Sequence, residues 1–501
     1  MSLYSDKFIQ IAEYGEVTEV VHPIVSVSGL PHIKSNEMVV FDNDEIGQVQ
    51  SIKKELTNIL VFSKHPLKVG QRVTRLDDVF RLKLNQDILG NVINATGQIV
   101  NTLTTNNKAG LDTNTEAKTF QIDNHSPSMD LRLATKSQFI TGVSLVDFLI
   151  PIGYGQRELV VGDRKTGKTS FLLTLLKNHI QNNGVVVYVS IGSNISETKN
   201  IQDFIIKNNL GKNTVMVSTT SDSSHADILL SPFTGMTIAE FFKDMGNNVL
   251  LILDNLSTHA MYYREISILS RRFPGRDSYP GDIFYLHARL LERAGSFKTK
   301  NDIKSSITCF PVAQTVENDL SDFIVSNLIS ITDGHILFDT SEFGKGRRPA
   351  INIALSVTRL GRQTQSLLLQ DLNRQLSSFL TSKYEKSLQL SHFGSELTDE
   401  IQQDLEVGND MYGFFNQGMG VIVPIQPALL FTAMVWLDMF KGESLTKIVV
   451  YRDIFVRSYI NDEKVSQLVN KTVDINSFKQ LLVSAIGEKE RLLELCKAKR
   501  S

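Results

Sequence analysis

A run of eight residues with the pattern Gly-x-x-x-x-Gly-Lys-Thr constrains the fold of this chain most strongly. Its members are Gly162, Asp163, Arg164, Lys165, Thr166, Gly167, Lys168 and Thr169. An apolar run ending at Val161 precedes it, and an amphipathic run beginning at Ser170 follows it. Glycines allow positive φ and close approach of the backbone, so several N–H groups can face phosphate oxygens. The order strand, glycine-rich loop, helix therefore predicts a phosphate-binding loop in an α/β domain.

The residue types in this loop indicate a nucleoside triphosphate as the ligand. The helix that starts at the loop contributes its partial positive charge, and Lys168 can reach the outer phosphates. The Thr169 hydroxyl can ligate Mg²⁺, and we expect Ser170 to join the loop residues at the phosphates. We predict that ATP or ADP binds here together with Mg²⁺.

A second run predicts a carboxylate at the same site. Residues 248–254 form an apolar, strand-like run that ends in Asp254. Ligands of doubly wound sheets bind at the carboxyl ends of the strands, so Asp254 is expected beside the loop. There it can bind Mg²⁺, directly or through water. A strand-terminal Asp read by itself is equally compatible with a purely structural role.

The composition excludes several classes of protein. The chain has 501 residues, which is long for a single domain, and its 42% hydrophobic and 21% charged residues are typical of a globular protein. A formal net charge of −2 provides no basic field for nucleic acid. Two cysteines, far apart in the sequence, fit a reducing compartment. The apolar runs are too short to cross a bilayer, and the N-terminus is unlike a secretory signal. We predict a cytoplasmic protein with no nucleic-acid partner.

Three segments of different character follow one another along the chain. Residues 1–76 carry short alternating β-branched runs separated by turn residues, which is typical of a small β-barrel. Residues 77–365 alternate strand-like and helix-like runs, which indicates a parallel sheet with flanking helices. Residues 366–501 show mainly helical periodicity, as in the long run at 477–497. We predict an α/β protein with an N-terminal β-barrel domain, a central nucleotide-binding domain and a C-terminal helical domain.

Three further features are ambiguous from the residues alone. Arg359 closes a strand-like run, where a guanidinium group can stabilise charge on a transferring phosphoryl group, yet most such arginines are simply solvated. The basic run at 345–348 is most simply a solvated turn. The aromatic and methionine-rich residues at 414–415 and 434–440 are typical of a buried helical core.

Several long segments resemble the alpha subunits of F-type ATP synthases. They are PIGYGQRELVVGDRKTGKT (151–169), PGRDSYPGDIFYLHARLLERA (274–294), ISITDG (329–334), RPAIN (348–352) and FGSEL (393–397). The similarity covers nearly the whole chain, and the order barrel, α/β domain, helical bundle matches that of the family. The resemblance implies that the central domain is RecA-like.

The resemblance also implies how the chain is used. Alpha-type and beta-type subunits alternate in a ring around a central rotating stalk, with a stator or other machinery as a further partner. The resemblance implies that the chain associates with the inner face of the cell membrane only through the assembled complex. Alpha subunits hold Mg-ATP without hydrolysing it. Beta-type chains carry a catalytic Glu where this chain has Ser193, whose hydroxyl is too weak a base. Glu197 lies nearby but is expected to face solvent on the next helix.

Four further residues receive roles from the resemblance. Arg359 matches the arginine finger that alpha subunits extend into the neighbouring beta-type site. Phe343 and Arg348 match positions that cover the adenine, and Gln417 matches an adenine contact.

The chain departs from the family pattern at several positions near the nucleotide. Lys165 stands where Gln is usual, Asn255 where Asp is usual, Thr358 where Ser is usual, and Met419 where a second Gln is usual. Two interpretations stay open: a synthase alpha subunit, or the alpha-type subunit of a divergent, mycoplasma-like rotary ATPase that powers another task such as motility. A self-sufficient homohexameric ATPase would need a catalytic Glu of its own. A spacer that binds no nucleotide would not need Lys168.

Overall fold

The computed structural model describes residues 2–54, 56–63, 65–104, 117–298, 303–392 and 398–497. The FGSEL segment at 393–397 lies outside the described residues. The chain forms two compact units. The first comprises Met1–Leu133, Asn183–Gln314 and Leu320–Thr332, and the second comprises Ala134–Asn182, Thr315–Asp319 and Asp333–Ser501.

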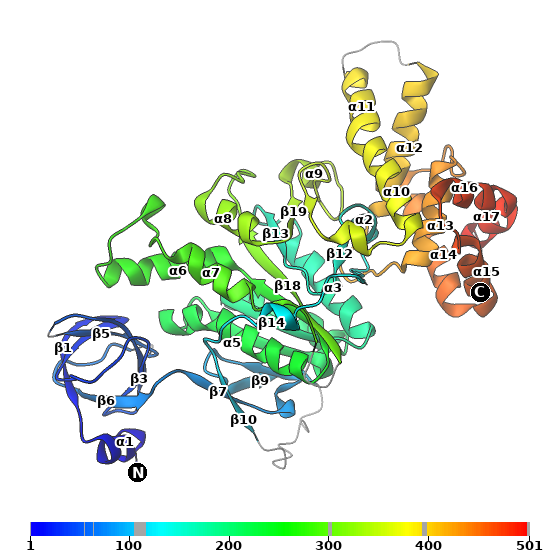
Figure 1. Cartoon of the computed structure of the whole chain (residues 1–501). Helices are drawn as coiled ribbons and strands as arrows, with labels where there is room; N and C mark the ends of the chain where they lie inside the picture. The colour runs from blue at the N-terminus through cyan, green and yellow to red at the C-terminus, as the bar shows by residue number, and fades with distance from the viewer. Residues whose placement is uncertain are drawn as a thin grey trace. The chain divides into compact units, whose positions relative to one another are not determined.

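The N-terminal part of the first unit is a closed six-stranded barrel (Figure 1). Its strands are β1 (Gly15–Val21), β2 (Ile24–Ser28), β3 (Met38–Phe41), β4 (Ile46–Ile52), β5 (Thr57–Val61) and β6 (Arg72–Asp77). They pair in the order β1-β2-β5-β4-β3-β6, and β6 closes the barrel on β1. Val27, Val39 and Ile59 are fully buried in its core. Helix α1 (Leu3–Ile11) precedes the barrel and is capped by the Ser2 hydroxyl.

The remainder of the first unit is built on a mostly parallel sheet. Its strands are β8 (Asn91–Ile93), β9 (Ile99–Thr102), β14 (Val185–Ser193), β15 (Thr214–Thr220), β16 (Asn248–Asp254), β17 (Gly295–Lys298) and β18 (Lys304–Gln314). Their order is β18-β16-β14-β15-β8-β9, with β17 paired to β18, and β9 and β17 run antiparallel to their neighbours. The first seven residues of β14 are all buried, as expected for an apolar strand covered on both faces.

Helices and a short ribbon complete the first unit. The helices are α4 (Ile195–Lys207), α5 (His225–Asp244), α6 (Leu256–Leu269), α7 (Ile283–Leu291) and α8 (Phe323–Ile331), and the ribbon pairs β7 (Arg81–Leu84) with β10 (Lys118–Gln121). Helix α5 packs against β14, β15 and β16. The strand predicted at 248–254 is thus confirmed as β16, and the helix expected to carry Glu197 is confirmed as α4.

The second unit contains the elements that carry the glycine-rich loop. They are β11 (Gln138–Phe139), α2 (Ser144–Leu149), β12 (Ile152–Gly153), β13 (Glu158–Gly162), α3 (Lys168–Gln181), β19 (Gly334–Phe338), α9 (Thr340–Gly344) and β20 (Val357–Thr358). Strand β13 pairs parallel with β19, and β20 pairs antiparallel with β19. All five residues of β13 are buried, and α3 buries Phe171, Leu172 and Leu175. The predicted order strand, loop, helix is confirmed.

The C-terminal part of the second unit is helical, drawn yellow to red in Figure 1. Its helices are α10 (Leu367–Ser378), a π-helix (Phe379–Tyr384), α11 (Glu385–His392), α12 (Asp399–Phe415), α13 (Ile425–Trp436), α14 (Leu445–Asn461), α15 (Glu463–Val473), α16 (Phe478–Gly487) and α17 (Lys489–Lys497). Phe414 stacks on Phe431 with ring centroids 5.5 Å apart, which confirms the predicted aromatic core. The helical run predicted at 477–497 is confirmed and forms two helices, α16 and α17, because Glu488 leaves the helical conformation between them.

The barrel, the mixed parallel sheets and the helical C-terminal region confirm the predicted fold class. The domain limits 1–76, 77–365 and 366–501 stay predictions. Within the described ranges, none of the helices is both long and apolar enough to cross a membrane.

Candidate functional site

The loop between β13 and α3 leaves space for a ligand at its tip. Gly162 has φ +151, and a Cβ built there would lie 2.2 Å from the carbonyl oxygen of Phe338. Gly167 has φ +102, and a Cβ built there would meet none of the surrounding described atoms within 4 Å. The first glycine is therefore required by close packing against β19. The second borders open space at the N-terminus of α3, which fits a phosphate cradle that a side chain would fill.

The Asp163 carboxylate holds the loop in place. It accepts hydrogen bonds from the Thr315 hydroxyl at 2.6 Å and from the backbone N–H of Asn318 at 3.0 Å. The Thr166 hydroxyl donates to the Asp163 carbonyl at 2.8 Å, and Thr315 N donates to the Gly162 carbonyl at 3.2 Å. These bonds tie the loop to residues about 150 positions later in the chain, so Asp163 acts as a positioning residue.

Lys168 lies across the inside of the loop. Its Nζ donates to the carbonyl oxygens of Gly162 and Asp163, both at 2.6 Å. This arrangement keeps the ammonium group beside the phosphate cradle, where two backbone carbonyl oxygens accept its hydrogen bonds. The next residue, Thr169, is exposed in the first turn of α3, and Ser170 is half-buried.

A pocket of about 420 Å³ opens at this loop, within the range of about 300–1,000 Å³ found for small-molecule sites. It is lined by Val143, Lys165, Thr166, Gly167, Lys168, Thr169, Ser170, Phe171, Thr174, Phe343, Arg348, Pro349, Gln417, Gly418 and Met419. The structure therefore brings together most of the predicted nucleotide-binding residues. Gly162, Asp163 and Arg164 belong to the same loop but do not line the pocket.

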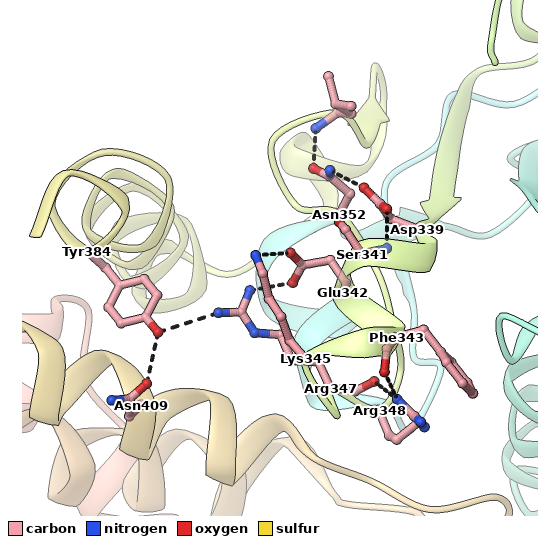
Figure 2. Close-up of polar contacts among 11 residues, drawn as sticks. Asp339, Ser341, Glu342, Phe343, Lys345, Arg347, Arg348, Asn352, Tyr384 and Asn409 are labelled. Carbon is pink, nitrogen blue, oxygen red and sulfur yellow. Dashed lines mark hydrogen bonds and ion pairs between the residues drawn. The ribbon is translucent and has the colours of Figure 1, made fainter. Parts of the chain in front are cut away.

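Phe343 and Arg348 form an aromatic and cationic wall of this pocket. The Arg348 guanidinium carbon lies 3.5 Å from the centroid of the Phe343 ring, a cation–π contact. Figure 2 shows Arg348 Nη1 donating to the carbonyl oxygens of Phe343 at 3.0 Å and of Arg347 at 2.7 Å. The guanidinium group is thus fixed against the ring. A planar base could stack at such a wall.

Gln417 forms part of the pocket wall through hydrogen bonds to the backbone. Its Oε1 accepts from Ser144 N at 2.8 Å, and its Nε2 donates to the carbonyl oxygens of Gly142 at 2.9 Å and Val421 at 3.1 Å. Both amide hydrogens are therefore in use. Met419 also lines the pocket and is 55% exposed.

A polar cluster next to Phe343 was not anticipated from the sequence. Glu342 is paired with Lys345 at 2.8 Å and with Arg347 (Figure 2). The guanidinium carbon of Arg347 lies 3.4 Å from the centroid of the Tyr412 ring. Arg347 Nη2 also donates to the Tyr384 hydroxyl at 3.5 Å. The solvated turn expected at 345–348 is therefore wrong for Arg347, because an acidic partner and two aromatic rings replace water around it.

Asp339 holds the start of this segment. Its carboxylate accepts from Asn352 Nδ2 at 2.9 Å, Ser341 N at 2.8 Å and Asn318 Nδ2 at 3.0 Å. Burial raises the pKa of Asp339, but the hydrogen bonds from Asn352 and Ser341 outweigh burial and lower it below its ordinary value. Asn318 therefore bonds both Asp163 in the loop and Asp339, the residue directly before α9.

Arg359 follows β20 directly, has an exposed side chain and does not line the pocket at the loop. Its backbone N–H donates to the Asp333 carbonyl at 3.0 Å. The positive charge of Arg359 also acts on the buried carboxyl group of Glu158. Burial raises the pKa of Glu158 well above its ordinary value, whereas the hydrogen bond from Gln156 and the charge of Arg359 act in the opposite direction.

Asp254 belongs to the first unit and ends β16 as predicted. Its Oδ2 accepts from the Tyr188 hydroxyl at 2.6 Å. Burial, followed by the negative charge of Asp254, raises the pKa of Tyr188 well above its ordinary value, so this hydroxyl stays a donor at neutral pH. Ser193 ends β14, and Glu197 is exposed in the first turn of α4, which confirms that its side chain faces solvent.

Comparison with known proteins agrees with this site. Residues 142–358 match the nucleotide-binding domain of the ATP synthase alpha/beta family. ATP synthase subunit alpha of Carsonella ruddii (strain PV) is 35% identical over 438 residues, covering 85% of this chain and 89% of that protein. The chain belongs to the ATP synthase alpha subunit family.

Two mycoplasma relatives support the same assignment. ATP synthase subunit alpha 1 of Mycoplasmopsis pulmonis (strain UAB CTIP) is 36% identical, covering 81% of this chain and 75% of that protein. ATP synthase subunit alpha of Mycoplasma genitalium (strain ATCC 33530 / DSM 19775 / NCTC 10195 / G37) is 36% identical, covering 83% of this chain and 79% of that protein. The predicted resemblance to alpha subunits is confirmed, and nucleotide binding is a property of the matched domain.

Proposed function

We propose that this alpha-type chain holds Mg-ATP or Mg-ADP without hydrolysing it and extends Arg359 into the catalytic site of a neighbouring beta-type subunit. The two kinds of subunit would alternate in a hexameric ring around a central rotating stalk, with a stator or other machinery as a further partner. A membrane would be reached only through that complex. The observation that carries the proposal is the pocket that the glycine-rich loop shares with Phe343 and Arg348.

The nucleotide would be held by groups that the structure already orders. Backbone N–H groups of the loop and the N-terminus of α3 would bind the phosphates, with Lys168 as the cationic partner. Phe343 and Arg348 would cover the adenine, and Gln417 would meet it as a rigid wall. Thr169 would ligate Mg²⁺, with Asp254 acting through water. The ion would neutralise the negative charge of the phosphates.

The absence of turnover at this site follows from the residue types present. Hydrolysis needs a group that orients or deprotonates the attacking water. Ser193 occupies the end of β14 where a carboxylate would be needed, and Glu197, the nearest carboxylate in sequence, is exposed on α4. The site would therefore bind nucleotide and keep it.

Arg359 suits the role of an arginine finger in a neighbouring site. A guanidinium group stays charged at every physiological pH, and its fork of donors matches phosphate oxygens. Its side chain is exposed directly after β20, and its backbone N–H is fixed to Asp333. A short, anchored segment can present this charge to another chain with little loss of conformational entropy.

The isolated chain tests the non-catalytic half of the proposal. Purified protein should bind Mg-ATP in calorimetry, should lose most of that affinity in the variant Lys168→Ala, and should release negligible phosphate. Steady phosphate release that copurifies with the chain and disappears in Lys168→Ala would contradict the proposal. Failure of the unaltered chain to bind Mg-ATP would refute the nucleotide-holding role.

A divergent rotary ATPase is the alternative that the pocket itself favours. Met419, which is 55% exposed in the pocket, and Lys165, which lines its phosphate end, both depart from the usual alpha-subunit residues. Affinity purification of the tagged chain separates the two cases. Recovery with a beta-type subunit and membrane-ring subunits supports a synthase, whereas recovery with a beta-type subunit and surface machinery supports the divergent motor. Recovery as a homohexamer would overturn both.

A further inference from the structure

The residues directly before the glycine-rich loop make unexpected contacts with the segment that carries Arg359. Strand β13 places Glu158 beside Gly334 of β19, and β20 places Thr358 on the other side of the same glycine. A Cβ at Gly334 would lie 2.6 Å from Glu158 Oε2 and 2.4 Å from the carbonyl oxygen of Val357. The missing side chain at Gly334 therefore lets the Glu158 carboxyl group lie against β19, close to β20.

A chain of hydrogen bonds joins this carboxyl group to the residue before Arg359. Gln156 Nε2 donates to Glu158 Oε2 at 2.7 Å and to the Thr358 hydroxyl oxygen at 3.2 Å. The other end of the same amide, Gln156 Oε1, accepts from Gly153 N at 2.9 Å. The Gln156 amide is thus held in one orientation, in which its NH2 group donates a hydrogen bond to Thr358.

The Thr358 hydroxyl group uses all of its hydrogen-bonding capacity. It donates to the Pro151 carbonyl at 2.9 Å and accepts from Gly361 N at 3.1 Å as well as from Gln156. Two accepted bonds and one donated bond use the full capacity of a hydroxyl group. Thr358 comes directly before Arg359, and Gly361 comes two residues after it. The hydrogen bond between the Thr358 hydroxyl oxygen and Gly361 N therefore joins the two ends of the bend that contains Arg359.

Arg157, the residue between Gln156 and Glu158, supports the same bend from the other strand. Its guanidinium group pairs with the Asp333 carboxylate at 2.7 and 2.9 Å, and Arg157 N donates to Asp333 Oδ2 at 2.9 Å. Asp333 in turn accepts the backbone N–H of Arg359 through its carbonyl oxygen at 3.0 Å. Gln156 and Arg157 therefore each bond a residue that holds the backbone around Arg359, and Glu158 is linked to it through Gln156.

The cost of this arrangement argues against a role in packing alone. Gln156 and Glu158 are both fully buried, and Glu158 Oε1 has no hydrogen-bond partner among the residues that the structure describes. A buried polar group without a hydrogen-bond partner is destabilising, and two apolar side chains in place of Gln156 and Glu158 would fill the same space at a lower cost in folding free energy. Such a group calls for a functional explanation.

We propose that Gln156 and Glu158 are positioning residues for Arg359, acting through the Thr358 hydroxyl group. The inference rests on the proposed arginine-finger role. The buried amide and carboxyl group fix the backbone at Thr358, so the guanidinium group is presented at one place to the neighbouring catalytic site. Displacement of a catalytic group by about 1 Å can cost on the order of 100-fold in rate.

The test is steady-state ATP hydrolysis by the assembled alpha–beta complex with a matched pair of variants. Thr358→Val removes the hydroxyl and keeps the shape, and we expect kcat to fall roughly 10- to 100-fold with KM changed by less than about threefold. Thr358→Ser keeps the hydroxyl and should restore most of the turnover. Gln156→Met, which removes the amide from the same chain of hydrogen bonds, should lower kcat in the same way and serves if the valine variant does not assemble.

A double variant shows whether the effect passes through Arg359. In the Arg359→Ala background, Thr358→Val should lower kcat by no more than about twofold further, because the group being positioned is absent. Full multiplication of the two effects would overturn the inference, as would wild-type kcat in both Thr358→Val and Gln156→Met while Arg359→Ala is crippled. Wild-type turnover in Arg359→Ala would instead overturn the proposed function itself.

Discussion

Replacing Arg347 by Met should loosen the segment that carries the aromatic wall of the nucleotide pocket. Figure 2 shows that Arg347 joins Glu342 to the Tyr384 hydroxyl. The guanidinium group of Arg347 also lies over the Tyr412 ring. The same segment, residues 339–349, includes Phe343 and Arg348. Methionine keeps an unbranched apolar side chain but removes the charge and every donor.

The size of the effect follows from burial. The side chains of Arg347 and Glu342 are 13% and 10% exposed, and breaking a fully buried pair costs about 3–5 kcal/mol. Lys345 remains 2.8 Å from Glu342 and compensates part of its charge. We therefore expect a loss of about 2 kcal/mol, which corresponds to a roughly 30-fold drop in protection against local opening.

Hydrogen exchange measures this loss at the amides of the segment. The amides of Arg347 and Phe343, bonded to the carbonyl oxygens of Glu342 and Asp339, report local opening directly. Lys345→Met is the matched control: it removes a partner of the same Glu342, but its side chain is 43% exposed, so we expect a change of less than about fivefold. Equal effects of the two variants, or a change below about threefold in Arg347→Met, would refute the argument from burial.

Three further predictions concern the loop and the first unit. Asp163→Ala should weaken Mg-ATP binding about tenfold in calorimetry, because the loop loses its bonds to Thr315 and Asn318; unchanged affinity would contradict a positioning role. Lys168→Ala should shorten nucleotide retention by the assembled complex while most of the initial hydrolysis rate survives, and loss of that rate with intact assembly would make this site catalytic. Burial lowers the pKa of His259 to about 4, so the unfolded chain binds more protons between pH 6.5 and 4. Neutral burial of this one group should therefore lower the stability of the first unit by roughly 3 kcal/mol as the pH drops through that window, as measured by hydrogen exchange, and a flat profile would contradict it.

The elements that bear the motifs could be predicted because their signals are local. An apolar strand before Gly162 and an amphipathic helix after Gly167 are encoded within a few residues of the loop. The end of β16 at Asp254 is visible in the same way, since a continuous apolar run stops at a carboxylate. The helical run at 477–497 is encoded locally too, and it forms α16 and α17.

The parts of the site that could not be predicted depend on contacts between distant residues. Asp163 meets Thr315 across 152 positions, and Gln417 meets Ser144 across 273. Hydrogen bonds of this kind leave no periodic pattern and no fixed spacing. Arg347 was misread for a related reason, because its exposure is set by Tyr384 and Tyr412 on helices that follow much later in the chain.

The most direct test of the account is ATP hydrolysis by the assembled complex carrying Arg359→Ala in the alpha-type chain. The account predicts that turnover falls by about a thousandfold or more while the ring assembles and the alpha-type sites still retain nucleotide. Arg359→Lys should rescue little, because an ammonium group lacks the planar fork of donors. Turnover equal to that of the unaltered complex would show that Arg359 has no part in catalysis.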